Sequence, residues 1–238
     1  MLNQFSRTEL LLGHNAMERL SKCRVAVFGI GGVGGYTVEA LVRSGIGAID
    51  LIDDDKVCLT NINRQIYATR KTVGKHKVDV AKERILDINP DVKVYTHKTF
   101  YMPDTADSVD LSVCDFVVDA IDTVTAKIEL AVRCDGLGIP CISCMGTGNR
   151  LDATKFAVTD INKTDTCHLA RVMRRELRKR GVKKLKVVYS TAEPRTPPID
   201  PEKRKQTPGS ISFVPPVAGM LCAGEVIRSL LECDKNTL

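Results

Sequence analysis

A glycine-rich segment, Gly29–Gly34 (GIGGVG), constrains the fold of this 238-residue chain more than any other feature. It follows a short β-branched run, Arg24–Phe28, typical of a buried strand, and it opens a stretch of helical periodicity, Gly34–Ser44. Glycines at a strand–helix junction permit a tight turn and let backbone N–H groups approach phosphate oxygens. Asp53 ends the next predicted strand, Ala48–Ile52, where a carboxylate can bind ribose hydroxyls. The pattern predicts a nucleotide-binding unit.

Two questions stay open at this point. The glycines have a purely structural interpretation, in which they only let the helix and the strand pack closely, but this does not account for the carboxylate of Asp53. The loop alone also does not distinguish ATP from NAD, FAD or S-adenosylmethionine.

Short apolar runs alternate with amphipathic stretches over the first 150 residues. This alternation predicts a doubly wound, Rossmann-like α/β fold with a mainly parallel sheet and helices on both faces. Three further strands are expected at Val92–His97, Phe116–Ile121 and Pro140–Met145, and two further helices at Gly74–Ile88 and Val124–Leu137. We assign residues 1–150, with an N-terminal helix, to a nucleotide-binding core, which the motifs described below identify as ATP-binding.

Residues 151–238 form a C-terminal mixed extension of the same domain, on the substrate side. Strands are predicted at Lys155–Thr159 and Leu185–Tyr189, on either side of a basic helix at His168–Arg180. The segment Thr191–Gly209 contains five prolines and a charged run, which predicts a mobile loop. An apolar helix, Val217–Leu231, follows it.

Composition favours a cytoplasmic protein. Hydrophobic residues make up 43% and charged residues 27% of the chain, as in soluble globular proteins. No uninterrupted apolar run reaches the roughly 18 residues of a membrane span, and the N-terminus lacks the features of a signal peptide. Nine cysteines, an odd number without a spaced framework, favour reduced thiols.

Basic and polar side chains follow the second predicted strand, in Asn61–Gln65 (NINRQ) and Gly74–Lys77 (GKHK). Arg64 offers a planar fork for phosphate oxygens, and Lys77 a compact charge at a helix start. Asp122 ends the fourth strand, where a carboxylate can hold Mg²⁺. Taken singly, a surface arginine and a helix-capping aspartate are the simpler interpretations. As an ordered set, the residues favour an enzyme that expels pyrophosphate from ATP.

Five motifs in order, GIGGVG, LIDDD, TNINRQ, GKHK and DAID, resemble the ThiF/MoeB superfamily of ubiquitin-activating-enzyme-like adenylating proteins over about residues 5–150. The opening RTELLLGHNAMERL, and the tail in outline, are similar to its tRNA threonylcarbamoyladenosine dehydratase (TcdA/CsdL-like) branch. The resemblance implies a homodimer that uses ATP and Mg²⁺, and it leaves a monovalent cation open. It implies cofactor-binding residues Gly29, Gly31, Gly32, Gly34, Asp53, Asp55, Asn61 and Gln65, and catalytic residues Arg7, Arg64, Lys77 and Asp122. Asp122 would be the metal ligand, and Arg7 would reach the partner subunit's ATP.

The activity implied by that branch is ATP-dependent cyclisation of threonylcarbamoyladenosine in tRNA, a dehydration that proceeds through adenylation of its carboxylate. The first alternative is adenylation of the C-terminal glycine of a ubiquitin-like sulfur carrier, by enzymes that usually hold zinc on two Cys-x-x-Cys pairs. Here Cys141 and Cys144 alone have that spacing, and they fall within a predicted strand, where residues three apart face opposite sides. No zinc site is predicted, which weighs against this alternative. The second is an NAD-binding regulatory or oxidoreductase module.

The segment Arg171–Lys186 carries nine cations and one acid, which predicts contact with RNA phosphates in the tRNA anticodon loop. The alternative is a solvated helix face. The candidate RNA-binding residues are Arg171, Arg174, Arg175, Arg178 and Lys183. Cys167 begins the same helix, and an ordinary helix-start cysteine is favoured over an activated thiolate. Some relatives carry a late-loop cysteine, absent here from residues 207–214, so a sulfur-transfer or cysteine desulfurase partner stays open.

Overall fold

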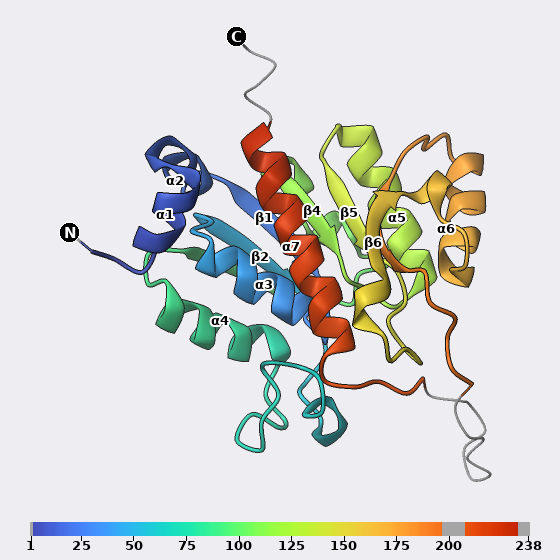
Figure 1. The fold of residues 1–238 in the computed structure, drawn as a ribbon, viewed down its shortest axis with the longest axis horizontal. Coiled ribbons are helices and arrows are strands. Elements are labelled where there is room, and N and C mark those ends of the chain that lie inside the picture. The colour runs from blue at the N-terminus through green and yellow to red at the C-terminus, as the bar shows by residue number, and fades with distance from the viewer. Residues whose placement is uncertain (1, 197–207, 233–238) are drawn as a thin grey trace.

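Seven strands form one sheet in the order β3-β2-β1-β4-β5-β7-β6 (Figure 1). The computed structural model describes residues 2–196 and 208–232. Every neighbouring pair is parallel except β6 with β7. The strands are β1 (Arg24–Phe28), β2 (Ala48–Ile52), β3 (Lys93–His97), β4 (Phe116–Asp119), β5 (Cys141–Cys144), β6 (Phe156–Asp160) and β7 (Lys186–Ser190). The predicted fold class is confirmed, and both strands of the C-terminal extension join the same sheet.

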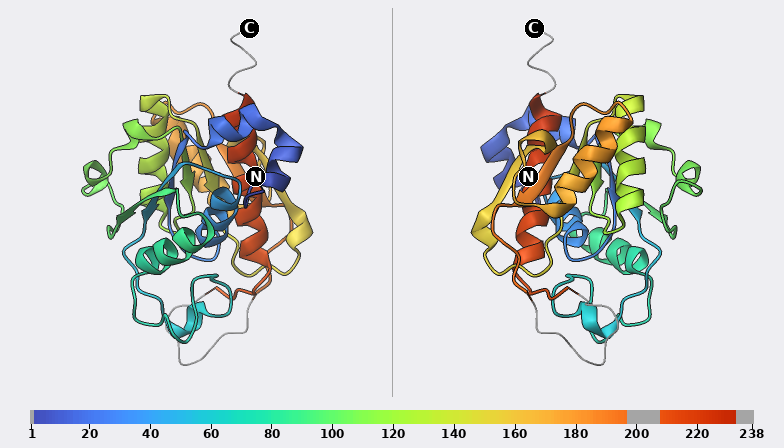
Figure 2. Two further views of the ribbon diagram at one scale, coloured as in Figure 1. Left: turned by 90° about the vertical axis from the view of Figure 1, so that its left-hand side faces the viewer. Right: turned by 90° about the vertical axis from the view of Figure 1, so that its right-hand side faces the viewer.

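Helices cover both faces of this sheet, and Figure 2 shows α7 on one side and α5 on the other. The helices are α1 (Ser6–Leu12), α2 (His14–Leu20), α3 (Gly34–Arg43), α4 (Lys77–Ile88), α5 (Val124–Leu137), α6 (His168–Lys179) and α7 (Val214–Glu232). The single N-terminal helix of the prediction is two helices, because Gly13 has φ +87° and interrupts the helical backbone.

The alternation of side chains in β1 divides the core into two layers. Val25 and Val27 pack with residues of α3, α4 and α7, and Ala26 and Phe28 pack with residues of α5. Helix α6 packs against α5 and β7 in a third apolar cluster. The sheet is therefore buried on both faces, as its continuous apolar strands predict.

Helix α7 begins three residues before its predicted start, since Pro215 and Pro216 occupy its first turn, where a missing N–H is tolerated. It crosses α3 closely: a Cβ on Gly219 would lie 2.3 Å from the carbonyl oxygen of Val33. Among the described residues it is the one helix long and apolar enough to span a membrane, with mean hydropathy 1.3, and 50% of that window is buried within the protein. Packing in the core accounts for its apolar composition.

The predicted mobile loop, Thr191–Gly209, lies mostly outside the described residues, which omit 197–207. Both described ends of the loop are bonded to Asn149, whose backbone has φ +58°. Its N–H donates to the Gly209 carbonyl at 2.7 Å, and its own carbonyl accepts from Arg195 N at 2.7 Å. The mobility of the loop stays a prediction.

Candidate active site

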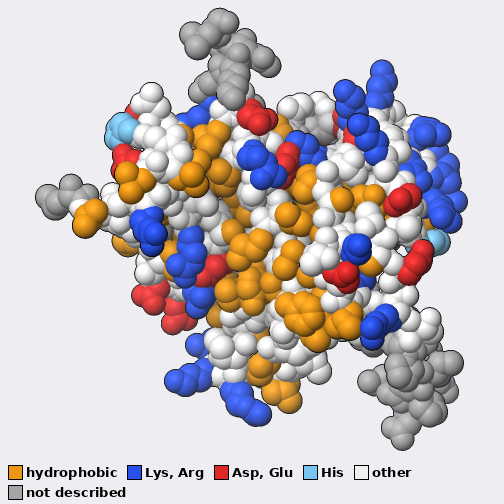
Figure 3. All heavy atoms as spheres, viewed as in Figure 1, with side chains coloured by type: hydrophobic (Ala, Val, Ile, Leu, Met, Phe, Trp, Pro, Cys, Tyr) orange, Lys and Arg blue, Asp and Glu red, His pale blue; other side chains and the backbone are white. Residues whose placement is uncertain are grey.

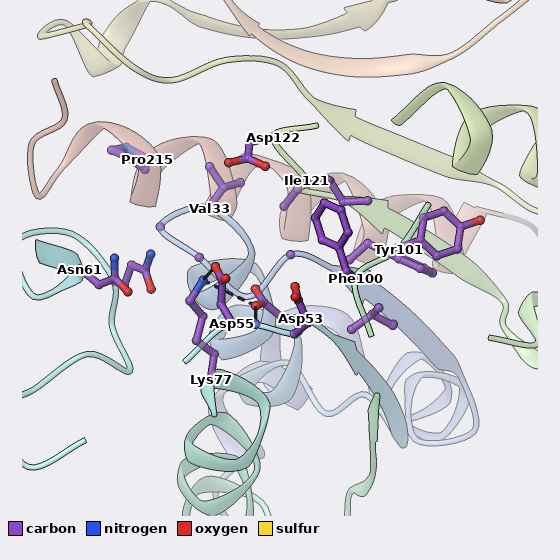
Figure 4. A pocket seen from close by; sticks show the side chains of 18 of the residues that line it. Val33, Asp53, Asp55, Asn61, Lys77, Phe100, Tyr101, Ile121, Asp122 and Pro215 are labelled. Atoms are coloured by element: carbon purple, nitrogen blue, oxygen red, sulfur yellow. Dashed lines mark hydrogen bonds and ion pairs between the residues drawn. The ribbon is translucent and has the colours of Figure 1, made fainter. Parts of the chain in front are cut away.

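A cavity of about 490 Å³ opens at the carboxyl edge of the sheet (Figure 4). Its walls are the segments that follow four parallel strands: 29–33 after β1, 53–55 after β2, 99–101 after β3 and 120–122 after β4. The chain changes direction across the sheet between β1 and β4, and ligands of open α/β sheets bind at such a switch point.

The glycines of the first loop serve two different purposes. Gly31 and Gly32 line the cavity. Gly29 has φ +84°, and a Cβ there would lie 2.6 Å from the Ala120 carbonyl oxygen. A Cβ on Gly34 would lie 1.8 Å from the Gly29 carbonyl oxygen, and Gly34 is not part of the cavity lining. At Gly34 the structural interpretation of the glycine therefore holds.

Asp53 joins the end of β2 to the glycine loop. Its Oδ2 accepts a hydrogen bond from Ile30 N at 2.7 Å, and its Oδ1 accepts one from Asp55 N at 2.9 Å. Burial raises the pKa of this carboxyl, while Lys77 and the two backbone donors oppose the shift. The carboxylate is thereby held in one orientation at the floor of the cavity.

Lys77 is the first residue of α4, and its side chain is 7% exposed. Its Nζ lies 2.6 Å from Asp55 Oδ2 and 3.6 Å from Asp53 Oδ1 (Figure 4). Asp55 is therefore a partner that holds the ammonium group in the cavity. The carboxylates of Asp53, Asp54 and Asp55 lie within 4.8 Å of one another, as in a cation site, but Lys77 already supplies positive charge to two of them.

Three predicted residues reach the cavity from the segment after β2. Asn61 is buried, and its Oδ1 accepts from Cys58 N at 3.1 Å, which orients the amide. Gln65 is also buried, next to Gly31. Arg64 is half-buried, and its Nη1 donates to Thr60 O at 3.1 Å and to Asn63 Oδ1 at 2.8 Å, so Nε and Nη2 have no acceptor among the described residues.

Asp122 lies in a loop rather than at the end of a strand, because β4 ends at Asp119. Its side chain is exposed and lies across the cavity from Lys77 (Figure 4). Its only described hydrogen bond is a long one, 3.4 Å from Thr123 Oγ1. The loop itself is fixed, since Ile121 N donates to Asp119 Oδ1 and Ile121 O accepts from Lys127 Nζ, both at 3.1 Å. The carboxylate is therefore free for a ligand on a rigid support.

The structure does not bring Arg7 to the cavity of its own chain. Arg7 is exposed on α1 and is not part of the lining. This placement is compatible with action on a second subunit.

The predicted RNA-binding residues lie on a separate surface over α6 and the turn after it, where Figure 3 shows Lys and Arg side chains gathered. Glu176 forms ion pairs with Lys179, Arg180 and Arg175 at 3.0, 3.0 and 3.2 Å. Hydrogen bonds from these cations, Lys179 first, lower the pKa of Glu176 to about 2. Arg174 uses its Nη1 on the carbonyl oxygens of Ile161 and Thr164.

Arg171, Arg178 and Lys183 form no ion pair with another described residue. Among the predicted RNA-binding residues, these three side chains are bonded to no carboxylate and no backbone carbonyl of the described chain. Their charge is therefore available to a ligand.

Sequence reasoning missed the apolar end of the cavity, formed by Phe100, Tyr101 and Ile121 (Figure 4). Tyr101 packs edge-on against Phe28, with ring centroids 4.8 Å apart. Phe100 and Tyr101 come three and four residues after the end of β3, and the segment that follows a parallel strand lies at the ligand-binding edge. That position was the available signal. Pro215 was missed because α7 is distant in sequence from the other walls.

Apart from the exposed Cys58, the described cysteines are buried or half-buried packing residues. Cys144 belongs to the cluster with Cys222 of α7, whereas Cys141 contacts the cluster with Cys134 of α5. The thiols of β5 therefore face opposite sides of the sheet, as the strand prediction requires. Cys167 is buried at the N-cap of α6, where its Sγ accepts from Ala170 N at 3.5 Å.

A doubly wound sheet with a glycine loop, a fixed carboxylate and two cations at its switch point defines a nucleotide-binding protein. The chain belongs to the ThiF family, whose model matches residues 5–238. It is 44% identical over 244 residues to a tRNA threonylcarbamoyladenosine dehydratase of Bacillus subtilis (strain 168), covering 98% of this chain and 96% of that one.

The solved structures agree with this assignment. An Escherichia coli TcdA structure in complex with AMP has a TM-score of 0.89 at 35% identity, and one in complex with ATP has 0.86 at 34%. Each comparison covers 98% of this chain and 96% of the other.

Proposed function

We propose that this protein is an ATP-dependent tRNA threonylcarbamoyladenosine dehydratase. Similarity to the Bacillus subtilis enzyme over nearly the whole of both chains supports the substrate. The observation that carries the chemistry is the cavity, in which Lys77, Arg64 and Asp122 surround the glycine loop.

ATP would bind along the cavity in one direction. The apolar end at Phe100 and Ile121 suits the adenine ring, and Asp53 suits the ribose hydroxyls. The phosphates would then lie over the glycine loop toward Lys77 and Arg64, beside Asn61 and Gln65. Asp55 supports this arrangement indirectly, by holding Lys77.

A magnesium ion fits the donor set at Asp122, an exposed carboxylate with free oxygens. When bound, Mg²⁺ would supply positive charge to the phosphate oxygens.

The reaction proceeds in two steps that need no enzyme nucleophile. The threonyl carboxylate attacks the α-phosphorus of ATP, pyrophosphate leaves, and Lys77 and Arg64 stabilise its growing charge. The carbamoyl group then attacks the acyl carbon of the adenylate, AMP leaves, and the ring closes with net loss of one water. Because both groups belong to one substrate, positioning alone gives a large rate advantage. No described cysteine lines the cavity, which agrees with such a mechanism.

The tRNA would lie across α6. Arg171, Arg178 and Lys183 are the cations available for phosphates, and Arg175 contributes less because Glu176 binds it. Arg174 would contribute mainly by fixing the loop before α6.

A homodimer in the cytoplasm completes the proposal. Leu10 and Leu11 on α1 are 88% and 82% exposed, and exposed apolar side chains also gather over α7 (Figure 3). Exposed apolar side chains of this kind favour contact with a partner subunit. In the dimer, Arg7 on α1 would reach the ATP of the partner subunit.

The test is pyrophosphate release from ATP and Mg²⁺, with tRNA that carries threonylcarbamoyladenosine and with the same tRNA lacking it. We expect release only with the modified tRNA, and a nucleoside product lighter by one water in mass spectrometry. Asp122→Asn should lower the release rate at least about 10-fold. Release that requires a protein carboxylate instead would overturn the substrate assignment and favour a sulfur-carrier-activating enzyme.

A further inference from the structure

Arg150 is the one buried charged residue in the described chain that lacks a partner of opposite charge. Its exposed fraction is 8%. The other buried charged residues are all in ion pairs: Glu39, Asp50, Lys77, Asp119 and Lys127. A buried charge without a counter-charge is costly. The described chain thus supplies no counter-charge for Arg150, and a bound anion could supply it.

The guanidinium is fixed but not saturated. Its Nε donates to the Gly146 carbonyl at 3.4 Å and its Nη1 to the Ala192 carbonyl. A guanidinium carries five N–H donors, so three have no acceptor among the residues that the structure describes. Nη2 has no acceptor among the described residues. It is also not completely buried, so solvent or a ligand can reach it. One edge of the fork is thus available to a ligand.

Arg150 lies beside the nucleotide cavity, on the side of strands β5 and β7. The two loops that hold it follow β5 and β7, which are adjacent parallel strands. Thr147, in the same loop as Arg150, lines the cavity. With strands about 4.8 Å apart, β7 lies about 10 Å from β4, whose loop carries Asp122. A group bound here would not be a phosphate held by the glycine loop.

The carboxyl end of β7 also lies beside α6, which carries the predicted RNA-binding residues. Thr166 Oγ1 donates to the Ser190 carbonyl at 3.4 Å, which places the start of α6 beside the end of β7. Arg171, in the first turn of α6, is exposed and has no described ion-pair partner. Arg150 therefore lies between the nucleotide cavity and the cationic helix.

We propose that Arg150 binds an anionic oxygen group of the RNA substrate, either the carboxylate of the modified base or a phosphodiester beside it. This inference rests on the proposed function. A planar guanidinium fixed by two loops is preorganised to bind carboxylate or phosphate oxygens. The bound anion would supply the counter-charge that the chain does not provide.

The experiment compares Arg150→Gln with the wild type in three binding measurements. The dissociation constants for modified tRNA and for the same tRNA without the modification are measured with a non-hydrolysable ATP analogue present, and the constant for the analogue is measured alone. We expect tRNA binding to weaken by roughly 10-fold or more and analogue binding to change less than about twofold. A loss confined to modified tRNA assigns the carboxylate. An equal loss for both assigns a phosphodiester, and the salt dependence of binding then falls by about 0.7 in logarithmic slope.

Two further variants separate binding from structural effects. Arg228→Gln removes an exposed cation at the far end of α7 and controls for net charge. Arg150→Lys keeps the charge and should recover part of the affinity if Gln proves unstable. Wild-type affinity of Arg150→Gln for both tRNAs, or a loss no larger than that of Arg228→Gln, would overturn the inference. If the wild-type protein released pyrophosphate at the same rate with and without modified tRNA, the proposed function itself would be refuted. That result needs no variant, so it is distinguishable from a failure of the inference about Arg150.

Discussion

Replacing Lys127 by Met tests how the walls of the cavity are held. The ammonium of Lys127 is completely buried, and it donates to Ile121 O at 3.1 Å, to Cys144 O at 2.8 Å and to Asp119 Oδ2 at 2.9 Å. Asp119 and Cys144 are the last residues of β4 and β5, and Ile121 lies in the loop that carries Asp122. Thr147 lies in the loop after Cys144. One side chain thus ties two loops of the cavity together.

The expected effect is large because Met leaves a charge behind. Asp119 is 1% exposed, and without Lys127 it keeps only Ser143 Oγ and Ile121 N as partners. Removing one member of a buried ion pair costs about 3–5 kcal/mol. For a chain of this size each kcal/mol shifts Tm by about 2–4 °C, so Lys127→Met should lower Tm by about 6–20 °C.

Urea unfolding measures the loss in free energy of unfolding, and a thermal scan measures the shift in Tm. Both are followed by circular dichroism, since the chain has no tryptophan for fluorescence. Lys22→Met, which breaks an exposed pair with Glu18, is the control and should leave the free energy of unfolding nearly unchanged. The double variant Asp119→Asn/Lys127→Met should be more stable than Lys127→Met, because no charge stays unpaired. A cost below about 1 kcal/mol for Lys127→Met, or a double variant in which the costs simply add, would refute the reasoning.

Three further predictions concern the loop, the apolar end of the cavity and acid stability. Gly34→Ala, whose Cβ would lie 1.8 Å from Gly29 O, should weaken ATP binding at least about 10-fold by calorimetry, whereas Gly136→Ala, with no atom within 4 Å, should not. Phe100→Ala should weaken ATP binding by roughly 10-fold if the ring contacts the base, and an unchanged Kd would remove the adenine from this end. Burial opposes ionisation of Glu39, but hydrogen bonds from arginines of α3 and α4 outweigh it and lower its pKa below 4.5. Its stabilisation is therefore complete above about pH 4.5 and lost as the pH falls through the lowered value, so Glu39→Gln should flatten the acid limb of urea-unfolding stability.

The sequence was sufficient for the architecture and for about half of the residues that line the cavity. Hydrophobic periodicity and β-branched runs placed the strands to within a few residues, because each run has to bury both faces in a parallel sheet. The residues after β1, β2 and β4 were found because each follows its strand directly, and parallel strands end at one edge. Two helix boundaries differ from the prediction. Gly13 divides the predicted N-terminal helix into two, and α7 includes Pro215 and Pro216 in its first turn.

Tertiary structure decided which residues are free to act. Sequence treats Gly29 and Gly34 alike, and a Cβ would clash with a carbonyl oxygen at both, but only the folded structure shows that Gly29 lines the cavity and Gly34 does not. Cation count likewise treats Arg171 and Arg174 alike, whereas in the described part of the chain Arg171 has no ion-pair partner and Arg174 is bonded to backbone carbonyls.

Asp55 and Arg150 illustrate the same limit. Periodicity and motif order report local conformation, so they identified the glycine loop and its carboxylate. The partner of a charge, by contrast, comes from elsewhere in the chain. Only the folded structure pairs Asp55 with Lys77 and leaves Arg150 buried without a described counter-charge.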